Sequence, residues 1–144
     1  MATQEKPLKE WTAIVTGATR GVGRGCAVEL AAQGAHVYIT GRTVREGDSR
    51  WPGSLESTIA EAETLGGQIE GIVCDHRDDE QVRAVFDRVM RDRGRLDVMV
   101  NNAGVMPLAL YSDHEIAGEA WDRCIDINFK GVLHGISCVH DQMT

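Results

Sequence analysis

The sequence predicts a doubly wound parallel α/β sheet with at least four strands. Short apolar runs alternate along the chain with segments of helical periodicity, which is typical of parallel strands joined by crossover helices. The fourth of these runs, residues 96–101, is almost continuously apolar, as expected for a strand covered on both faces. The first run passes directly into a glycine-rich turn and a helix, which is how such a sheet begins.

Two strands and the helix between them are predicted near the start of the chain. The first strand covers residues 12–16, and its helix runs from about residue 20 to residue 33, where Gly34 is a typical C-terminal cap. Residues 35–40 form the second strand. The polar segment 42–53 exceeds the roughly two to six residues usual for such a connection, so we interpret it as a surface loop with a role of its own.

A helix and the third strand come next. Ser54 is a typical N-cap, and the pair Gly66-Gly67 ends the helix. Residues 68–74 form the third strand, with Asp75 at its carboxyl end. One face of the helix is apolar, as packing on a sheet requires: Leu55, Ile59, Ala62 and Leu65.

Asp78 and Gln81 resemble a capping box at the start of the following helix, which Gly94 ends. After the fourth strand, residues 118–142 are expected to form one long helix. The helix that begins at Asp78 has a buried face at helical spacing: Val82, Val85, Phe86, Val89 and Met90.

Composition narrows the class of protein. With 144 residues, 42% of them hydrophobic, the chain can bury one core, and we expect a single domain over residues 1–144. The net charge of −7 argues against a nucleic acid partner, because phosphates would meet no basic stripe. The sequence contains neither a membrane-spanning apolar stretch nor a signal peptide. We therefore expect a cytoplasmic protein with reduced thiols: Cys26, Cys74, Cys124 and Cys138.

The segment Thr16-Gly17-Ala18-Thr19-Arg20-Gly21-Val22-Gly23 has the composition of a phosphate-binding turn. A strand that turns at once into a helix leaves unpaired backbone N–H groups at the helix start, and these attract phosphate. Gly17 permits the sharp turn, Gly21 lets the backbone approach a pyrophosphate, and Gly23 lets the helix pack against the strand. The order of elements thus predicts a nucleotide site.

Three motifs make the sequence similar to the short-chain dehydrogenase/reductase family. Residues 16–23 fit its T-G-x-x-x-G-x-G loop, residues 101–104 fit its N-N-A-G, and Asn128 fits the helix asparagine of its catalytic tetrad. The resemblance implies a Rossmann fold with strand order 3-2-1-4 and a nicotinamide dinucleotide as cofactor. It also implies an oxidoreductase that interconverts a small carbonyl compound and a secondary alcohol.

The resemblance further implies individual roles. Asp75 and His76 match the position that meets the adenine ring, where Asp75 accepts a hydrogen bond from the exocyclic amine. The alternative for Asp75 is an acid that only shapes the start of the next helix. The cofactor-binding residues implied are Gly17, Thr19, Arg20, Gly21, Val22, Gly23, Arg42, Asp75, His76, Asn102, Ala103 and Gly104.

Two asparagines are expected to act through their amides. Asn101 is expected to cross-link neighbouring strands. For Asn128 the resemblance implies a catalytic-site residue whose carbonyl kinks the helix and holds a water. The alternative is an asparagine that faces solvent.

The residues also predict which dinucleotide is preferred. A site for NAD would place an acid about 20 residues beyond the glycine loop, to bond the ribose 2′-hydroxyl. Here Thr40-Gly41-Arg42 ends the second strand, and the next acid is Glu46. Arg42, helped by Arg20, could form charge-assisted bonds to a 2′-phosphate, which favours NADP over NAD. The alternative is that both arginines are solvated loop charges.

In the family, a serine and a Tyr-x-x-x-Lys pair complete the catalytic set. Here Tyr38 is followed four residues later by Arg42, and Tyr111 by Glu115. The resemblance ends with the helix that carries Asn128, so the chain is expected to supply only the cofactor-binding part and to be inactive alone. The histidines lack the spacing of a metal site.

Without the family's later strands, residues 96–100 are expected to form an exposed apolar edge. Together with the apolar last helix, this edge favours a homo-oligomer. Two other interpretations stay open: a non-enzymatic nucleotide-binding or dimerisation module, and an adenosyl-cofactor methyltransferase. The methyltransferase interpretation leaves residues 101–104 and Asn128 unexplained.

Overall fold

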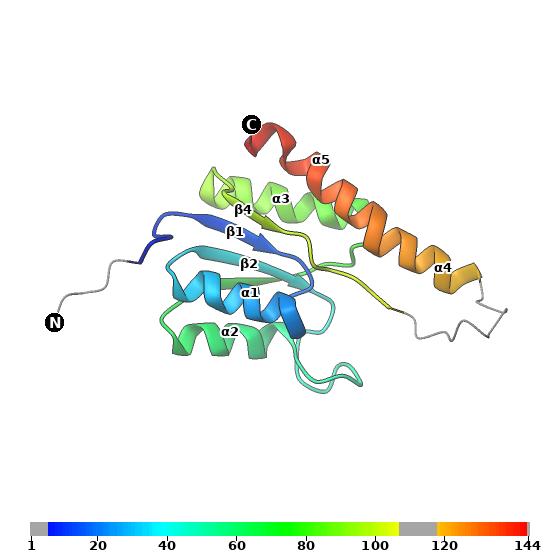
Figure 1. Cartoon of the computed structure of the whole chain (residues 1–144), viewed down its shortest axis with the longest axis horizontal. Helices are drawn as coiled ribbons and strands as arrows, with labels where there is room; N and C mark the ends of the chain where they lie inside the picture. Colours follow the sequence, from blue (N-terminus) through cyan, green and yellow to red (C-terminus); the bar gives the residue numbers. More distant parts are fainter. Residues whose placement is uncertain (1–5, 107–117, 144) are drawn as a thin grey trace.

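The computed structural model describes residues 6–106 and 118–143. Its four strands form one parallel sheet in the order β3-β2-β1-β4, which confirms the predicted order (Figure 1). Val15 at the end of β1 pairs with Ile39 of β2 on one side and with Val100 of β4 on the other. The strands are β1 Thr12–Val15, β2 His36–Gly41, β3 Gln68–Val73 and β4 Val98–Val100.

Helices cover both faces of the sheet, so the fold is doubly wound as predicted. One face is covered by α1 and α2, and the other by α3 and the C-terminal helical segment (Figure 1). The helical elements are α1 Gly21–Ala32, α2 Leu55–Thr64, α3 Asp79–Arg93, α4 Gly118–Ile125, the π-helical turn η1 Asp126–Lys130 and α5 Gly131–Met143.

The core consists of two clusters, one on each face of the sheet, because successive strand residues point to opposite sides. Val37 and Ile39 of β2 pack toward α1 and α2, whereas Tyr38 packs toward α3 and α5. All three are fully buried. Burying an aliphatic side chain of this size stabilises the fold by about 1.5–3 kcal/mol, so the central strands hold the sheet together.

The helix starts follow the predicted caps with one difference. Ser54 caps α2 through its hydroxyl, and Ser57 returns the bond to the Ser54 N–H. Asp78 caps α3, but the Gln81 side chain bonds the Asp78 carboxylate and the N–H of Asp75. The box is therefore not reciprocal: Gln81 ties α3 to the end of β3.

The last helical segment is not the uniform helix that the sequence predicts. A five-residue π-helical turn, η1, separates α4 from α5. The predicted edge is also less exposed than expected, because Leu96 is buried and β4 is half-buried. Val98 and Val100 pack against the core cluster on the α1 side of the sheet, and Met99 packs against the cluster on the α3 side.

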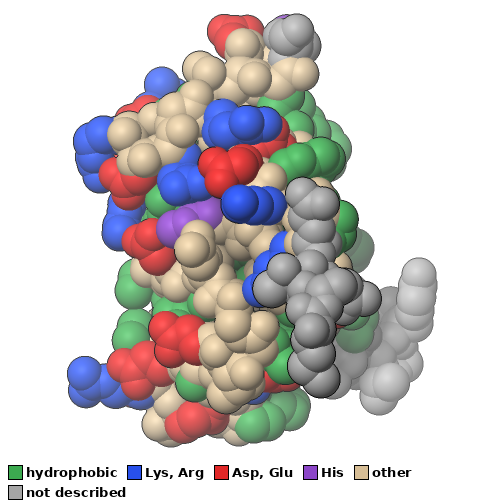
Figure 2. Space-filling model, turned by 90° about the vertical axis from the view of Figure 1, so that its left-hand side faces the viewer, with side chains coloured by type: hydrophobic (Ala, Val, Ile, Leu, Met, Phe, Trp, Pro, Cys, Tyr) green, Lys and Arg blue, Asp and Glu red, His purple; other side chains and the backbone are tan. Residues whose placement is uncertain are grey.

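Charges are mixed on the surface at the amino ends of the strands. Lys and Arg side chains lie among Asp and Glu side chains over this face (Figure 2).

Among the described residues, none of the helices has the length and apolar character needed to cross a bilayer. All four cysteines are free thiols, as predicted, and burial raises the pKa of Cys74 to about 12.

Candidate functional site

A crevice of about 320 Å³ lies at the carboxyl ends of the strands. The strand order β3-β2-β1-β4 reverses direction between β1 and β4. Doubly wound sheets bind ligands at such a switch point, and the crevice lies there. Four of the predicted site residues, Gly21, Val22, Gly23 and Asn128, lie outside its lining. Those that line it are Gly17, Thr19, Arg20, Arg42, Asp75, His76, Asn102, Ala103 and Gly104.

Two glycines of the loop are required by close backbone approach. Gly17 has φ +67°, and a Cβ there would lie 2.7 Å from the Cα of Ala103. A Cβ at Gly23 would collide with the Asn102 side-chain amide and lie 2.7 Å from the Gly17 carbonyl oxygen. The absence of side chains at these positions therefore lets the β4 end meet the start of α1.

Asn102 joins this loop to β4. Its Nδ2 donates to the carbonyl oxygens of Thr16 at 2.9 Å and Gly17 at 3.0 Å. The Thr16 hydroxyl in turn accepts the N–H groups of Asn102 and Ala103, each at 2.9 Å. The cross-linking amide expected of Asn101 is thus supplied by Asn102. Thr16 begins the glycine-loop motif, but the sequence alone assigned it no role, because its partners lie far along the chain.

Thr16→Val should destabilise the fold by about 3 kcal/mol, because two backbone N–H groups would lose their acceptor. Thr16 is only 4% exposed, so water cannot replace the hydroxyl readily. Thr16→Ser keeps the hydroxyl and should stay within about 1 kcal/mol of the parent. Urea unfolding of both variants measures the difference, and equal losses would show that the methyl group matters more than the hydrogen bonds.

The two predicted arginines are placed differently. Arg20 stands at the N-cap of α1, and its guanidinium donates to the Pro52 carbonyl at 2.9 Å and the Gly53 carbonyl at 3.0 Å. A further bond reaches the Thr43 hydroxyl at 3.3 Å. Arg42 is exposed and lines the crevice. Arg20 therefore holds the loop 43–53, while Arg42 faces the crevice.

Asp75 lies at the crevice and is also joined to the start of α3. It lines the crevice, and its carboxylate also pairs with the Arg77 guanidinium at 2.8 Å. Hydrogen bonds from Arg77 hold the pKa of Asp75 at about 2. Its own N–H donates to Gln81, so the residue is fixed to the start of α3. The carboxylate is therefore charged and oriented at the rim of the crevice.

His76 is tied to the glycine loop through Thr40. Its Nε2 lies 2.7 Å from the Thr40 hydroxyl oxygen, which also accepts the Gly17 N–H at 3.3 Å. Burial lowers the pKa of His76, against a smaller opposing effect of Asp75. Burial therefore disfavours the charged form of the imidazole beside the turn.

Stability should fall as the pH drops below the ordinary histidine pKa of 6.5, because the unfolded chain then binds a proton that folded His76 resists. Thermal unfolding from about pH 8 to about pH 5 measures the loss. His76→Gln keeps a polar group beside Thr40 and should flatten this profile. His140→Gln, at an exposed position, should leave it unchanged. Equal slopes in all three proteins would assign the pH dependence to other groups.

Asn128 lies in the π-helical turn and faces the strand end rather than solvent alone. Its amide pairs with both backbone groups of Val105: Nδ2 donates to the carbonyl and Oδ1 accepts the N–H, each at 2.8 Å. This pair joins the chain beyond β4 to the last helix. A wide turn of this kind is frequent at functional sites.

Of the two tyrosines, Tyr38 is buried in β2, and Tyr111 lies outside the described residues. Within the described parts of the chain, no group of three or more His, Cys, Asp or Glu side chains could hold a metal ion. Among the described residues, the groups that the site offers a ligand are backbone amides, guanidinium groups and one carboxylate.

These features are those of a dinucleotide-binding oxidoreductase fold. The family model for short chain dehydrogenase matches residues 11–144. The chain belongs to the short-chain dehydrogenase/reductase family, whose members bind a nicotinamide cofactor and small substrates. This membership rules out the methyltransferase interpretation.

Curated relatives are similar over most of this chain but are longer. The chain is 38% identical over 131 residues to human "Dehydrogenase/reductase SDR family member 1". The matched stretch covers 87% of this chain and 39% of that protein. It is 37% identical over 126 residues to (-)-trans-carveol dehydrogenase of Rhodococcus erythropolis, covering 85% and 45%. The chain thus spans less than half the length of these relatives.

Solved structures have the same fold. A metagenomic short-chain oxidoreductase in complex with NADP superposes with a TM-score of 0.81 at 32% identity, covering 94% of this chain and 57% of that one. The citronellol catabolism dehydrogenase of Pseudomonas aeruginosa gives a TM-score of 0.78 at 32% identity, covering 98% and 54%.

Proposed function

We propose that this chain is the cofactor-binding part of an NADP(H)-dependent oxidoreductase that interconverts a carbonyl compound and a secondary alcohol. The observation that carries the cofactor preference is Arg42, a guanidinium at the end of β2 where an NAD site places a carboxylate. The NADP bound to the metagenomic oxidoreductase supports the same choice. When bound, the nicotinamide supplies or accepts the hydride.

The residues present fit such a dinucleotide. An added Cβ at Gly21 would meet no atom within 4 Å, so this part of the turn leaves open space for a pyrophosphate above the first amides of α1. Thr19 lines the crevice, and Val22 and Gly23 belong to the first turn of α1. Asp75 and His76 would border the adenine, and residues 102–104 the adenosine ribose.

We further propose that the chain alone binds the cofactor without turnover. Neither tyrosine of the sequence is followed by a lysine at the spacing of the family's proton donor. The part of the reaction assigned to this chain is orientation: Asn128 holds the segment that follows β4 at Val105, which lines the crevice.

Titration with NADPH and NADH tests this function. We expect NADPH to bind at least about tenfold more tightly, which corresponds to about 1.4 kcal/mol from contacts to one phosphate. Tighter binding of NADH would reject the cofactor assignment. Failure of both to bind would favour the dimerisation half of the non-enzymatic alternative.

That alternative, a dimerisation module, is favoured by one observation. Large apolar side chains recur at helical spacing along α4, η1 and α5 and are about half exposed. We propose that copies of the chain associate through them, and a sharp monomer boundary in analytical ultracentrifugation would refute this. The stripe consists of Trp121, Ile125, Phe129, Leu133 and Ile136.

A further inference from the structure

A second hollow, of about 610 Å³, lies where the strands begin, at the end of the sheet opposite the crevice. It lies on the face of the molecule that Figure 2 shows. His36 and Gln68, the first residues of β2 and β3, line it. Gly34 and Gly66, which follow the ends of α1 and α2, line it as well. We call this hollow the amino-end pocket.

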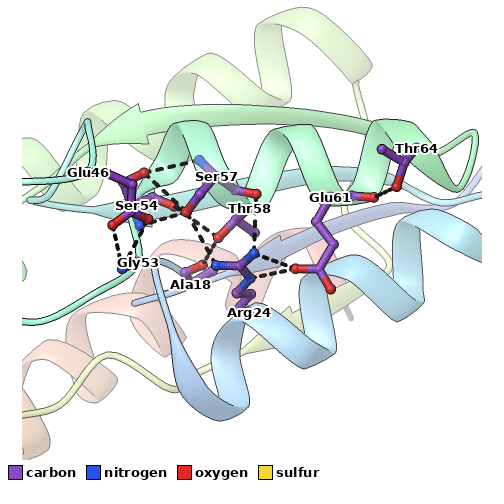
Figure 3. A network of polar contacts seen from close by, with 9 residues as sticks. All are labelled: Ala18, Arg24, Glu46, Gly53, Ser54, Ser57, Thr58, Glu61 and Thr64. Atoms are coloured by element: carbon purple, nitrogen blue, oxygen red, sulfur yellow. Dashed lines mark hydrogen bonds and ion pairs between the residues drawn. The ribbon is translucent and has the colours of Figure 1, made fainter.

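The walls of the amino-end pocket are held in place. Arg24 of α1 pairs with Glu61 of α2 at 2.6 Å, which joins the two helices (Figure 3). The segment before β1 packs on their ends, because a Cβ at Gly34 would lie only 2.7 Å from Cβ of Lys6. The Lys6 ammonium donates to the Gly66 carbonyl at 2.9 Å. The start of the described chain is therefore fastened to the ends of both helices.

Two lysines, one arginine and one acid line this pocket, although the chain as a whole carries a net charge of −7. Lys6 keeps two ammonium N–H groups beyond its bond to the Gly66 carbonyl. Arg93 donates from Nε to the Thr12 hydroxyl at 3.4 Å. Lys9 makes no side-chain hydrogen bond or ion pair with any described residue. The pocket therefore gathers cations whose hydrogen-bonding capacity is largely unused.

Helix ends explain only part of this arrangement. Cations near the C-terminus of a helix complement its dipole, which accounts for Lys6 beside the end of α2 and for Arg93 at the end of α3. Lys9 has no such partner. The next residue, Glu10, has φ +72°, a left-handed backbone that non-glycine residues rarely adopt. Strain of this kind clusters at functional sites, so its place beside Lys9 points to a ligand.

The acids closest to the pocket are offset by other cations. Glu70 lies 2.8 Å from Nε2 of His36. The hydrogen bond to Asp97 is the main cause that raises the pKa of Arg95, and the charge of Glu10 adds to it. Glu10 thus acts on a cation outside the pocket lining. The pocket itself keeps a positive balance of charge.

We propose that the amino-end pocket binds a small anion with at least two negative charges, which is the shared chemistry of phosphorylated and polycarboxylate metabolites. Lys9 and Arg93 would hold the anion, together with the remaining ammonium N–H groups of Lys6. All three cations are exposed, so binding should weaken as the salt concentration rises. This site lies at the other end of the sheet from the crevice and does not depend on the proposed cofactor.

Nuclear magnetic resonance titration of the full chain at constant ionic strength tests the proposal. Pyrophosphate is one probe and citrate the other. We expect the backbone amide signals of Lys9, Gly34 and Gly66 to shift until the site is saturated. The signals of Gly17 and Gly21 report the crevice in the same spectra, so an anion bound at the glycine turn is recorded separately. The probe that binds more tightly assigns the phosphate or the carboxylate class.

Variants show whether the predicted side chains hold the anion. Lys9→Gln should weaken binding about fivefold, and Lys9→Arg, which keeps the cation, should stay within about twofold of the parent. Arg91→Gln is the matched control for charge: Arg91 belongs to the same helix as Arg93 but is 70% exposed and pairs with Asp92. It should change the affinity by less than about twofold.

Two results would overturn the proposal. One is that neither anion shifts the signals at the amino-end pocket, whatever happens at the crevice. The other is that Lys9→Gln and Arg91→Gln weaken binding equally, since the attraction would then come from overall charge. Because Lys9 makes no side-chain bond within the described chain, its replacement should leave the remaining amide signals in place and so report binding alone.

Discussion

Gly17→Val should abolish dinucleotide binding and destabilise the fold by about 3 kcal/mol. Two costs combine, because φ is +67° at this position and the new Cβ would press on the Cα of Ala103 at 2.7 Å. The Cα and the backbone nitrogen of Ala103, the two nearest atoms, cannot rotate away as a side chain would. The turn would have to open, and the first amides of α1 would leave their place. We expect NADPH affinity to fall by more than about 100-fold, as measured by titration.

Gly25→Ala is the matched control. Gly25 lies within α1, and an added Cβ would meet no atom within 4 Å. The substitution should leave NADPH affinity unchanged and stabilise the helix by up to about 1 kcal/mol in urea unfolding. If Gly17→Val bound NADPH as the Gly25→Ala variant does, the pyrophosphate could not rest on this turn.

Arg42→Asp should reverse the preference between the two dinucleotides. The substitution removes the cation proposed to meet the 2′-phosphate and introduces an anion, which is also the group that bonds a 2′-hydroxyl in NAD sites. Because Arg42 is exposed, solvent screens part of the effect. We expect NADPH to bind about 100-fold more weakly and NADH several-fold more tightly. The ratio of the two dissociation constants is the measurement.

Arg45→Asp makes the same change of charge three residues away, on a side chain that pairs with Glu56. It should lower NADPH affinity by less than about threefold, which is the contribution of overall charge. If the two substitutions had equal effects, the preference would come from the general field of the protein and not from contact with Arg42.

The strand order and the crevice were predictable because both depend on local patterns. The apolar run before Gly17 and the glycines themselves fix a strand, a turn and a helix within a dozen residues. Nine predicted residues that line the crevice come from four segments whose strands end at one edge of the sheet. Parallel topology brings such ends together without further information.

Other features depend on long-range contacts that no local pattern encodes. The Thr16 hydroxyl serves N–H groups of Asn102 and Ala103, more than 80 residues away. Arginine is a residue type that binds phosphate, yet the partners of Arg20 are two loop carbonyls. These carbonyls lie 32 and 33 residues further along the chain. Carbonyl acceptors belong to every residue, so the sequence could not mark Pro52 and Gly53 as its targets.

The wide turn η1 gives the last helical segment a place where one residue can be lost without a change of phase. In a regular helix each residue advances by about 100° around the axis, whereas a π-helical turn holds about one residue more. Deleting one residue between Asp126 and Lys130 would therefore leave a regular turn, with Val139 still in the core beside α3 and Gly135 still against Met99. The same deletion in the first turn of α5 would rotate the residues after it by about 100°, so we expect it to destabilise the fold more.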